Sequence, residues 1–329
     1  MTRKTLCFSS MHRWPWQRQM ADPLRVSDGV WSSGGCFWHI ASELPEGVSG
    51  ASYDYWVTWD EPWKGRIRRD IPLDRRVLLI TEPREYKDYG ILLPLHGVIV
   101  TPYDLACRLP AGSRQIFAPP LINWFYGVDT RGAPVSTVNL AGIEAMPVPE
   151  KTGLCSIVCS DIGTLPAHRE RVLFFRTLRT VFKDRIDCFG RGHAVIPDKK
   201  DAVDRYKYVI CLENNLCERF WTEKAADAFL GHAMPVYCGC PDFGKWFPED
   251  SFARIDFRQP DRAMRVIDAL LREDPWKQRL PAIMEARRRL LRDYNFFTAL
   301  PRLLDALPAL RQGILSEKDV TRRYLSGGQ

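Results

Sequence analysis

The segment YKYVICLENNLCERFWTEKAADAFLGHAMPVYCGC, residues 206–240, indicates the fold of the chain. Its apolar run YKYVICL (206–212) does not alternate strictly, as is typical of a central parallel strand covered on both faces. TEKAADAFLGHA (222–233) has apolar residues at helical spacing, and PVYCG (235–239) reads as a second strand. Such strand–helix–strand units are right-handed almost without exception. The segment therefore predicts an α/β domain built on a parallel sheet.

Two polar clusters interrupt this otherwise apolar unit. Glu213 and Asn214 follow the first strand, at the carboxyl end where open α/β sheets bind their ligands. Thr222 stands directly before the helix and is a good N-cap residue, because its hydroxyl accepts a hydrogen bond from a backbone N–H group of the first turn. The clusters therefore indicate a ligand site at the sheet edge.

Lys224 is unusual in the first turn of this helix. A cation there opposes the helix dipole, at a cost of about 0.3–1 kcal/mol. A bound anion would reverse that cost, because the N–H groups, the dipole and the ammonium would all face one phosphate. An ordinary ion pair of Lys224 with Glu218 or Glu223 explains the residue equally well. The helix alone leaves both interpretations open.

The same alternation continues through the second half of the chain. Strands are predicted at 155–160 and 186–190, and helices at 169–182, 262–272 and 281–294. Helices that separate strands in this way indicate a parallel sheet with helices on both faces.

The first half gives a weaker α/β pattern. Strands are predicted at 53–59, 75–81 and 96–102, and CFWHIASEL (36–44), which follows Gly34-Gly35, is predicted to be a helix. At 329 residues the chain suits two domains, and AMPVPEKTG near residues 144–153 is the predicted linker. We therefore expect an N-terminal domain, a second α/β domain and a helical tail, with the boundaries 1–148, 149–300 and 301–329.

Composition restricts the class of partner. A formal net charge of +7 favours an anionic partner, either a phosphate-bearing ligand, a nucleic acid or a membrane surface, although an inert basic surface is equally consistent with it. The 10 cysteines form no Cys-x-x-Cys pair and no histidine spacing suits zinc, so we expect reduced, buried thiols and no metal. No apolar stretch reaches the length of a signal or membrane segment. We expect a cytoplasmic protein, with room for peripheral association with the anionic inner membrane face.

The spacing of these elements resembles the donor-binding domain of the family 10 (GT10) α-1,3/4-fucosyltransferases. The resemblance covers mainly residues 155–257 and rests on four elements: Tyr206-Lys207-Tyr208, Glu213-Asn214, Thr222-Glu223-Lys224 and Pro235-Val236…Gly239. It implies a GT-B glycosyltransferase with two Rossmann-like domains that face each other across a cleft. It also implies inverting transfer of L-fucose from GDP-fucose to a glycan hydroxyl, α-1,3 to a GlcNAc- or Glc-type sugar.

In this family, two cations contact the diphosphate of the donor. Lys224 matches the first, and Arg191, which follows the strand predicted at 186–190, is the best match to the second. A solvated loop arginine is the alternative for Arg191. The resemblance implies that no metal or cofactor is required beyond the donor substrate, and the sequence has no Asp-x-Asp motif.

The remaining donor-side residues follow from the same resemblance. Glu223 matches a glutamate that hydrogen-bonds the ribose or the donor sugar, although an acid in a first helical turn also complements the dipole. Glu213 and Asn214 match the pair that shapes the sugar pocket, and a buried structural network is their alternative. Thr222 belongs to the same motif, and Phe220 stands where many members carry tyrosine, so its ring packs on the donor without a hydroxyl contact.

Inverting transfer requires a carboxylate that deprotonates the acceptor hydroxyl. The sequence RRVLLITEPREY offers Glu82 at the end of a predicted strand, with Glu85 as the second choice and a purely structural turn as the alternative. His39 is a weaker acceptor-side candidate. Three tryptophans either stack on acceptor sugars or belong to the core: Trp59, Trp63 and Trp124.

Some features depart from the family or leave other functions open. Ser160-Asp161 stands where many members have Ser-Asn, and Lys199 and Lys200 are either family-like or surface charges. The alternatives are a GT-B enzyme with another nucleotide-sugar donor, a catalytically inactive binding subunit, and a nucleic-acid binder suggested by EARRRLLRDY (285–294). In that last segment the arginines alternate with apolar residues as on an ordinary surface helix, so we expect no nucleic-acid partner. By extension of the resemblance, the acceptor setting is a bacterial surface glycan such as a lipopolysaccharide O-chain.

Overall fold

The computed structural model describes residues 4–10, 25–27, 30–33, 36–40, 53–83, 87–105, 108–120, 124–131, 135–159, 166–190 and 192–325. The chain divides into two compact units, one formed by Met1–Leu121 together with Arg292–Gln329 and the other by Ile122–Leu291. This division differs from the predicted boundaries at 148/149 and 300/301. The predicted linker, residues 144–153, lies inside the second unit, where it joins a short helix to the first strand of the sheet.

The first unit contains an eight-stranded sheet with the order β2-β3-β4-β1-β5-β6-β7-β8. From β4 to β8 all neighbouring strands are parallel, and β2, β3 and β4 are joined by antiparallel pairings at one edge. The strands are β1 (Lys4–Ser10), β2 (Arg25–Ser27), β3 (Val30–Ser33), β4 (Cys36–Ile40), β5 (Tyr55–Trp59), β6 (Arg76–Leu79), β7 (Val98–Thr101) and β8 (Arg114–Phe117). Short 3₁₀ helices lie between them at Trp63–Gly65, Leu73–Arg75 and Leu93–Leu95.

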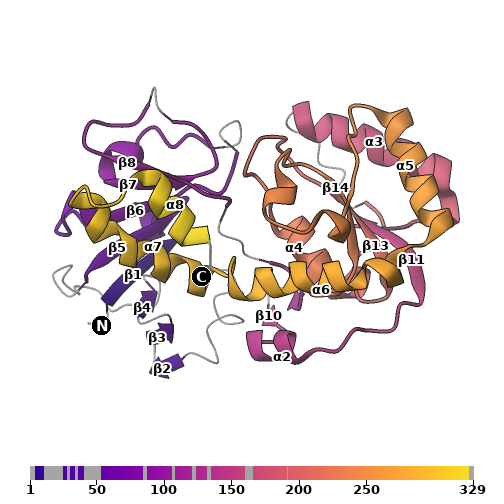
Figure 1. The fold of residues 1–329 in the computed structure, drawn as a ribbon, viewed down its shortest axis with the longest axis horizontal. Helices are drawn as coiled ribbons and strands as arrows, with labels where there is room; N and C mark the ends of the chain where they lie inside the picture. Colours follow the sequence, from indigo (N-terminus) through magenta and orange to yellow (C-terminus); the bar gives the residue numbers. More distant parts are fainter. Residues whose placement is uncertain are drawn as a thin grey trace. The chain divides into compact units, whose positions relative to one another are not determined.

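Two C-terminal helices complete this unit. α7 (Phe296–Arg311) and α8 (Glu317–Leu325) lie over the first sheet, as Figure 1 shows in yellow. The ring of Phe296 packs against Phe8 of β1 and Trp59 of β5, with ring centroids 5.1 Å apart in both pairs. The segment predicted as a separate tail, residues 301–329, is therefore helical where the structure describes it but forms part of the core of the first unit.

The predicted strands of the first half are confirmed as β5, β6 and β7, and one predicted helix is wrong. Cys36–Ile40 forms β4, which pairs in parallel with β1 and antiparallel with β3. The run is apolar and aromatic, so it fits a strand between two neighbours as well as a helix, and the pairing partners decide between the two. Residues 41–44 of that prediction lie outside the described residues.

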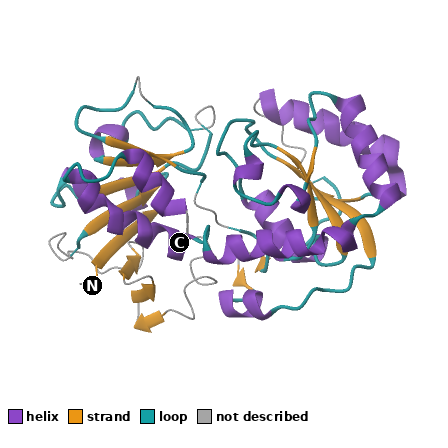
Figure 2. Cartoon of the chain, viewed as in Figure 1, coloured by secondary structure: helices purple, strands orange, loops and turns teal. Residues whose placement is uncertain are grey.

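The second unit contains a five-stranded, fully parallel sheet with the order β12-β11-β13-β14-β15. Figure 2 shows helices on both sides of its strands. The strands are β11 (Gly153–Val158), β12 (Asp187–Phe189), β13 (Tyr206–Leu212), β14 (Met234–Cys238) and β15 (Ala253–Arg254), and a separate antiparallel pair is formed by β9 (Val128–Asp129) and β10 (Val135–Ser136). The helices are α2 (Leu140–Ala145), α3 (Pro166–Phe182), α4 (Glu223–Leu230), α5 (Pro260–Glu273) and α6 (Trp276–Arg292), with 3₁₀ helices at Lys183–Arg185, η7 (Lys199–Ala202), Phe243–Lys245 and Glu249–Ser251.

The strand order of the second sheet determines where a ligand can bind. The chain passes from β11 to β12 on one side and continues with β13 on the other side of β11. Open α/β sheets bind ligands at such a reversal, beyond the carboxyl ends of the strands. Glu213 directly follows β13 and therefore stands at this point.

The expected α/β class, with a mostly parallel sheet in each unit, is confirmed. Among the residues that the structure describes, none of the helices combines the length and the apolar character that a bilayer span requires.

Candidate functional site

Glu213 is the buried centre of the candidate site. Its side chain is 0% exposed, and its backbone N–H donates to the Cys238 carbonyl on the neighbouring strand, at 2.8 Å. Its carboxylate accepts from Thr222, from the backbone N–H at 2.8 Å and from the hydroxyl at 2.7 Å. A Cβ atom at Gly239 would lie 2.5 Å from Cγ of Glu213, so only glycine fits beside it. The carboxylate is thus fixed by contacts from β14 and from the start of α4.

Thr222 is the N-cap of α4, as predicted from the sequence. Its hydroxyl oxygen accepts from the backbone N–H of Lys224 while the hydroxyl proton points to Glu213. The cap therefore joins the helix start to the end of β13, two points that are nine residues apart in sequence. One threonine side chain fixes the geometry of both elements.

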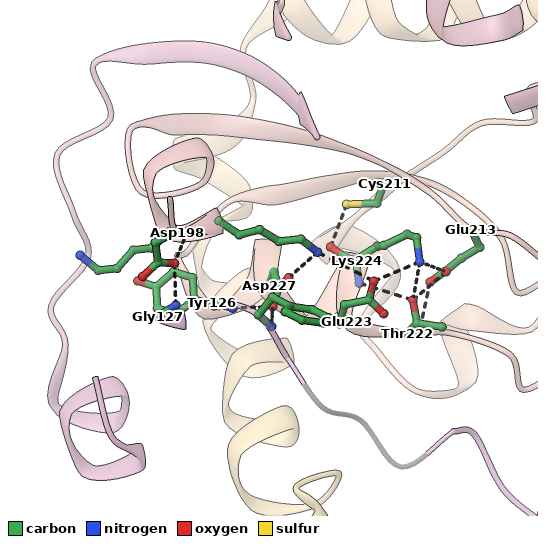
Figure 3. A network of polar contacts seen from close by, with 12 residues as sticks. Tyr126, Gly127, Asp198, Cys211, Glu213, Thr222, Glu223, Lys224 and Asp227 are labelled. Atoms are coloured by element: carbon green, nitrogen blue, oxygen red, sulfur yellow. Dashed lines mark hydrogen bonds and ion pairs between the residues drawn. The ribbon is translucent and has the colours of Figure 1, made fainter. Parts of the chain in front are cut away.

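The ammonium of Lys224 lies among three oxygen atoms. Its Nζ is 3.3 Å from Glu213 Oε2 and 3.1 Å from Glu223 Oε1, and it donates to Thr222 Oγ1 at 3.2 Å. Of the two open interpretations of Lys224, the ion pair with Glu223 is what this structure contains. The pairing does not exclude a phosphate ligand, because the side chain remains 22% exposed. Figure 3 shows these contacts.

A second ammonium extends the network along α4. Lys199, from η7, lies 3.0 Å from Asp227 Oδ2 and 3.8 Å from Glu223 Oε1. Asp227 is buried and its other oxygen accepts from the backbone N–H groups of Phe125 and Tyr126. Lys199 is therefore not a free surface charge, which was one of its two sequence interpretations.

Burial and charge set the protonation of this cluster. Burial acts to raise the pKa of Glu223, but Lys224 and Lys199 outweigh it and hold that pKa at about 2. Burial raises the pKa of Glu213, and it raises the pKa of Asp227 to about 6 against the opposing effect of Lys199. For Lys224 burial acts to lower the pKa, yet Glu223 and Glu213 raise it above its ordinary value. Glu223 and Lys224 are consequently both charged at neutral pH.

Arg171 is a cation of this site that the sequence reasoning missed. It lies on α3, is buried, and donates from Nη1 to Asn214 Oδ1 at 2.5 Å. Its charge also acts on Lys224, whose pKa it tends to lower. Its Nε is buried and has no hydrogen-bond partner among the described residues, which is rare for a buried polar atom. The Nε–H group of Arg171 is therefore a donor beside Asn214 that no described residue uses.

A cavity of about 370 Å³ lies beyond the carboxyl ends of β14 and β15. Gly239, which contacts the Glu213 position, lines it together with three arginines: Arg254, Arg258 and Arg262. Arg258 is paired with Asp256 at 2.8 Å, and Arg254 donates to the Cys240 carbonyl at 3.2 Å. The cavity gives the same sheet edge room for a ligand and a positive lining.

Not every predicted donor-side residue reaches this site. Phe220 is only 2% exposed and forms part of the core beneath the loop, as does its neighbour Trp221. Arg191, Ser160 and Asp161 lie outside the described residues. The structure thus leaves Phe220 in the core and brings together seven residues: Arg171, Lys199, Glu213, Asn214, Thr222, Glu223 and Lys224.

The predicted acceptor-side base, Glu82, lies at the carboxyl edge of the first sheet. It follows β6 and is half-buried, and the preceding residue Thr81 is bound to Asp60 through its backbone N–H at 2.8 Å and through its hydroxyl. Asp60 is 1% exposed and also accepts from the Tyr89 hydroxyl at 2.5 Å. Glu82 therefore stands on a firmly held backbone. Glu85 lies outside the described residues.

The other acceptor-side candidates belong to the interior where they are described. Trp59 is 6% exposed and packs on Phe296, and Trp124 is 1% exposed. His39 lies on β4 with its ring against Tyr53, and burial lowers the pKa of His39. The side chain of Trp63 lies outside the described residues. The core interpretation of Trp59 and Trp124 therefore holds in this structure.

In the part of the chain that the structure describes, no three of the His, Cys, Asp and Glu side chains are grouped as a metal ion would require. The carboxylates of Glu213, Glu223 and Asp227 are paired with the ammonium groups of Lys199 and Lys224. These ammonium groups occupy carboxylate oxygens that a metal cation would need.

Residues 148–278 match the model of the glycosyltransferase family 10 (fucosyltransferase) C-terminal domain. This part of the chain is similar to the family 10 domain. The match covers β11 to the start of α6 and so contains the whole cluster of charged residues around Glu213, Glu223 and Lys224. The resemblance seen in the sequence is thereby confirmed for this domain.

Curated relatives align with the same region. The chain is 34% identical over 130 residues to the α-(1,3)-fucosyltransferase FucT of Helicobacter pylori, an alignment that covers 37% of this chain and 25% of that protein. It is 29% identical over 136 residues to the human 4-galactosyl-N-acetylglucosaminide 3-α-L-fucosyltransferase FUT6, covering 40% and 37% respectively. The chain thus spans between a quarter and two fifths of the length of these relatives.

A crystal structure of an α1,3-fucosyltransferase with GDP is also similar to this chain. It is 18% identical, with a TM-score of 0.47, and the alignment covers 85% of this chain and 82% of that one.

Proposed function

We propose that this protein is an inverting GT-B fucosyltransferase that moves L-fucose from GDP-fucose to a hydroxyl of a glycan acceptor. The observation that carries the proposal is the family 10 domain, whose motif residues Glu213, Thr222, Glu223 and Lys224 form one contact network at the carboxyl edge of the second sheet. The names of the relatives, all fucosyltransferases, support the donor.

The leaving group is a diphosphate, and its growing charge needs cations that are already in place. We assign this role to Lys224 and Arg171. Lys224 stands at the N-terminus of α4, where the helix dipole also favours an anion. Arg171 has an unused donor beside Asn214. Arg191, the match expected from the sequence, remains a prediction, since it lies outside the described residues.

The donor-binding cluster must rearrange to accept a diphosphate. Lys224 is paired with two carboxylates, so an incoming phosphate competes with Glu213 and Glu223 for the same ammonium. Glu213 is fixed by two hydrogen bonds from Thr222 and cannot move with Lys224. The side chain of Glu223, in contrast, is partly exposed at the helix start. We therefore assign Glu223 to the hydroxyls of the ribose or the fucose, because a carboxylate can accept two hydrogen bonds from vicinal hydroxyls.

The acceptor hydroxyl requires a general base, and we retain Glu82 for this role. It is half-buried at the edge of the first sheet, and the backbone N–H of the preceding residue, Thr81, donates to Asp60. The transfer as proposed uses no metal or cofactor. The setting we propose is a cytoplasmic surface-glycan pathway, with the net charge of +7 favouring contact with anionic lipid.

The proposal is tested with purified protein by titration with GDP and by transfer of labelled fucose from GDP-fucose to a panel of glycans. We expect Lys224→Ala to abolish transfer and to weaken GDP binding. The matched control is Lys245→Ala, which removes an exposed lysine of the same unit that pairs with Asp242. Unchanged GDP affinity in Lys224→Ala would remove the phosphate assignment.

A donor other than GDP-fucose is the second candidate, because cations at a helix start bind any diphosphate. Shifts of the melting temperature with GDP, UDP, CDP and their sugars separate the two candidates. The fucose donor requires stabilisation by GDP and GDP-fucose above the others, and equal stabilisation by UDP would overturn it. Binding of GDP-fucose without transfer to any glycan would favour an inactive binding subunit.

A further inference from the structure

Lys199 lies between two carboxylates of α4, although it belongs to a different element. Its Nζ is 3.0 Å from Asp227 Oδ2 and 3.8 Å from Glu223 Oε1. Glu223 and Asp227 are four residues apart on the helix, so they are neighbours on one face and repel each other when both are charged. The ammonium of Lys199 compensates this repulsion.

The backbone that carries Lys199 is fixed. Asp198 caps η7 and accepts on Oδ1 from the backbone N–H groups of Lys200, at 2.8 Å, and Gly127, at 2.9 Å. Its Oδ2 accepts from the Thr137 hydroxyl at 2.8 Å. Figure 3 shows Asp198 and Gly127 at one end of the network and Glu213 and Thr222 at the other. The start of the Lys199 side chain is therefore held in place.

The far end of the Lys199 side chain is fixed as well. Asp227 Oδ1 accepts from the backbone N–H groups of Phe125, at 2.9 Å, and Tyr126, at 3.0 Å, so Asp227 presents only Oδ2 to the ammonium. The ammonium also lies 5.0 Å from the centre of the Phe125 ring. Asp227 cannot turn away from Lys199 without losing two hydrogen bonds to buried backbone.

Both ammonium groups of the cluster approach Glu223 at the same oxygen. Lys224 lies 3.1 Å and Lys199 3.8 Å from Oε1. We assign the other oxygen of Glu223, Oε2, to the substrate hydroxyl. When a diphosphate draws Lys224 away, Lys199 is the cation that remains on Oε1.

We propose that Lys199, held by Asp227, is a positioning residue that orients the carboxylate of Glu223 toward a hydroxyl of the nucleotide sugar. This inference rests on the proposed role of Glu223 in donor binding. It adds two residues, Lys199 and Asp227, that need not touch the substrate themselves.

A double-mutant cycle tests whether Lys199 acts through Glu223. We expect Lys199→Met, which keeps the side-chain length and removes the charge, to lower kcat/KM for GDP-fucose by about tenfold to hundredfold, as for loss of one contact to a charged group. We expect Glu223→Gln to lower it at least as much. The variant with both changes should lose no more than Glu223→Gln alone, because the positioned group is already gone.

Matched variants separate positioning from folding. Lys200→Met removes a neighbouring lysine that pairs with Asp204 at 3.1 Å, and it should leave kcat/KM within about twofold. Asp227→Asn keeps an oxygen for the Phe125 and Tyr126 N–H groups and should reproduce the Lys199→Met defect in weaker form. It also provides the test if Lys199→Met does not fold, as judged by circular dichroism and melting temperature.

The outcomes distinguish this inference from the proposed function. If Glu223→Gln lowers kcat/KM but the loss from Lys199→Met simply multiplies with it, Lys199 acts elsewhere and the inference is wrong. A Lys199→Met variant that is as active as Lys200→Met would also show that the inference is wrong. If Glu223→Gln itself changes neither GDP-fucose affinity nor transfer, the donor role of Glu223 fails, and the inference fails with it.

Discussion

Each of the two sheets carries a buried carboxylate directly after a central parallel strand. Asp60 follows β5 in the first unit and Glu213 follows β13 in the second. Both accept two hydrogen bonds from a single threonine, one from the backbone N–H and one from the hydroxyl: Thr81 for Asp60 and Thr222 for Glu213. The same hydrogen-bond arrangement therefore occurs at the carboxyl edge of both sheets.

The third partner differs between the two. Asp60 accepts from a neutral hydroxyl, that of Tyr89, whereas Glu213 lies 3.3 Å from the ammonium of Lys224, which also contacts Glu223. Tyr89 is itself buried, and burial and Asp60 together raise the pKa of its hydroxyl, so it stays a donor. The Asp60 arrangement has only neutral donors, whereas the Glu213 arrangement contains a cation that is shared with a second carboxylate.

Among changes at these two carboxylates, removing the ammonium of Lys224 should lower the free energy of unfolding most. Lys224→Met leaves Glu213 buried without its charged partner, and loss of one partner of a buried pair costs about 3–5 kcal/mol of stability. Because Glu213 can then take up a proton, the loss should be smaller at pH 5 than at pH 8. Urea denaturation at both pH values measures it, and an equal loss at both would contradict the buried-charge explanation.

At Asp60 in the first unit, stability should depend on keeping a hydrogen-bond acceptor and the backbone conformation rather than on the negative charge. Asp60→Ala leaves the Thr81 and Tyr89 donors unsatisfied and places alanine at a φ of 52°, so we expect a loss of about 2–4 kcal/mol. Asp60→Asn keeps an acceptor and tolerates that φ, and should lose clearly less. Denaturation measures both variants, and GDP titration should show unchanged affinity in Asp60→Asn. Equal losses from the two variants would argue against this dependence.

Arg171 sharpens the comparison, because nothing in the described part of the first unit places an arginine beside Asp60. We expect Arg171→Gln to weaken GDP binding by about tenfold to hundredfold, as for loss of one charge-assisted contact. Arg176→Gln is the control, since Arg176 is an exposed arginine on the same helix, α3. Isothermal titration compares the two. If Arg176→Gln weakens binding as much, the effect reflects net charge and not the site.

An effect that appears only as a pH dependence concerns Asp227, whose pKa is raised to about 6 by burial against the opposing effect of Lys199. The folded state then binds more protons than the unfolded chain between about pH 4 and pH 6, so this group makes stability fall as the pH rises through that window. Asp227→Asn should remove a pH dependence worth about 3 kcal/mol across that window, since one pKa unit corresponds to about 1.4 kcal/mol. The measurement is the difference in unfolding free energy between wild type and variant from pH 4 to pH 7; a constant difference would contradict it.

Much of the second unit is predictable from local sequence. The strand at 206–212 and the N-cap at Thr222 each follow from patterns within a few residues, and both are confirmed. The ligand edge after β13 follows from the same patterns and stays a prediction. The sequence does not decide whether Lys224 faces a phosphate or forms an ion pair with a nearby carboxylate. The loop between Glu213 and Thr222 brings the two together in space, and no local pattern describes that closure.

Features that depend on distant contacts were missed. Arg171 is one of four arginines spaced along 169–179, and only the fold shows that it is the buried one beside Asn214. The β4 run was predicted as a helix because its pairing with β1 and β3 is not visible in the sequence. For the same reason, the sequence predicts a helical tail at 301–329 but not the sheet on which α7 packs.

The return of α7 and α8 to the first sheet makes the second unit an insertion within the first. The second unit is one continuous stretch, 122–291, whereas the first is assembled from both ends of the described chain. We therefore expect the usual order of folding during synthesis, in which the N-terminal domain folds first, to be reversed. The second unit is complete once residue 291 has been made, whereas the first sheet still lacks Phe296, which packs on it.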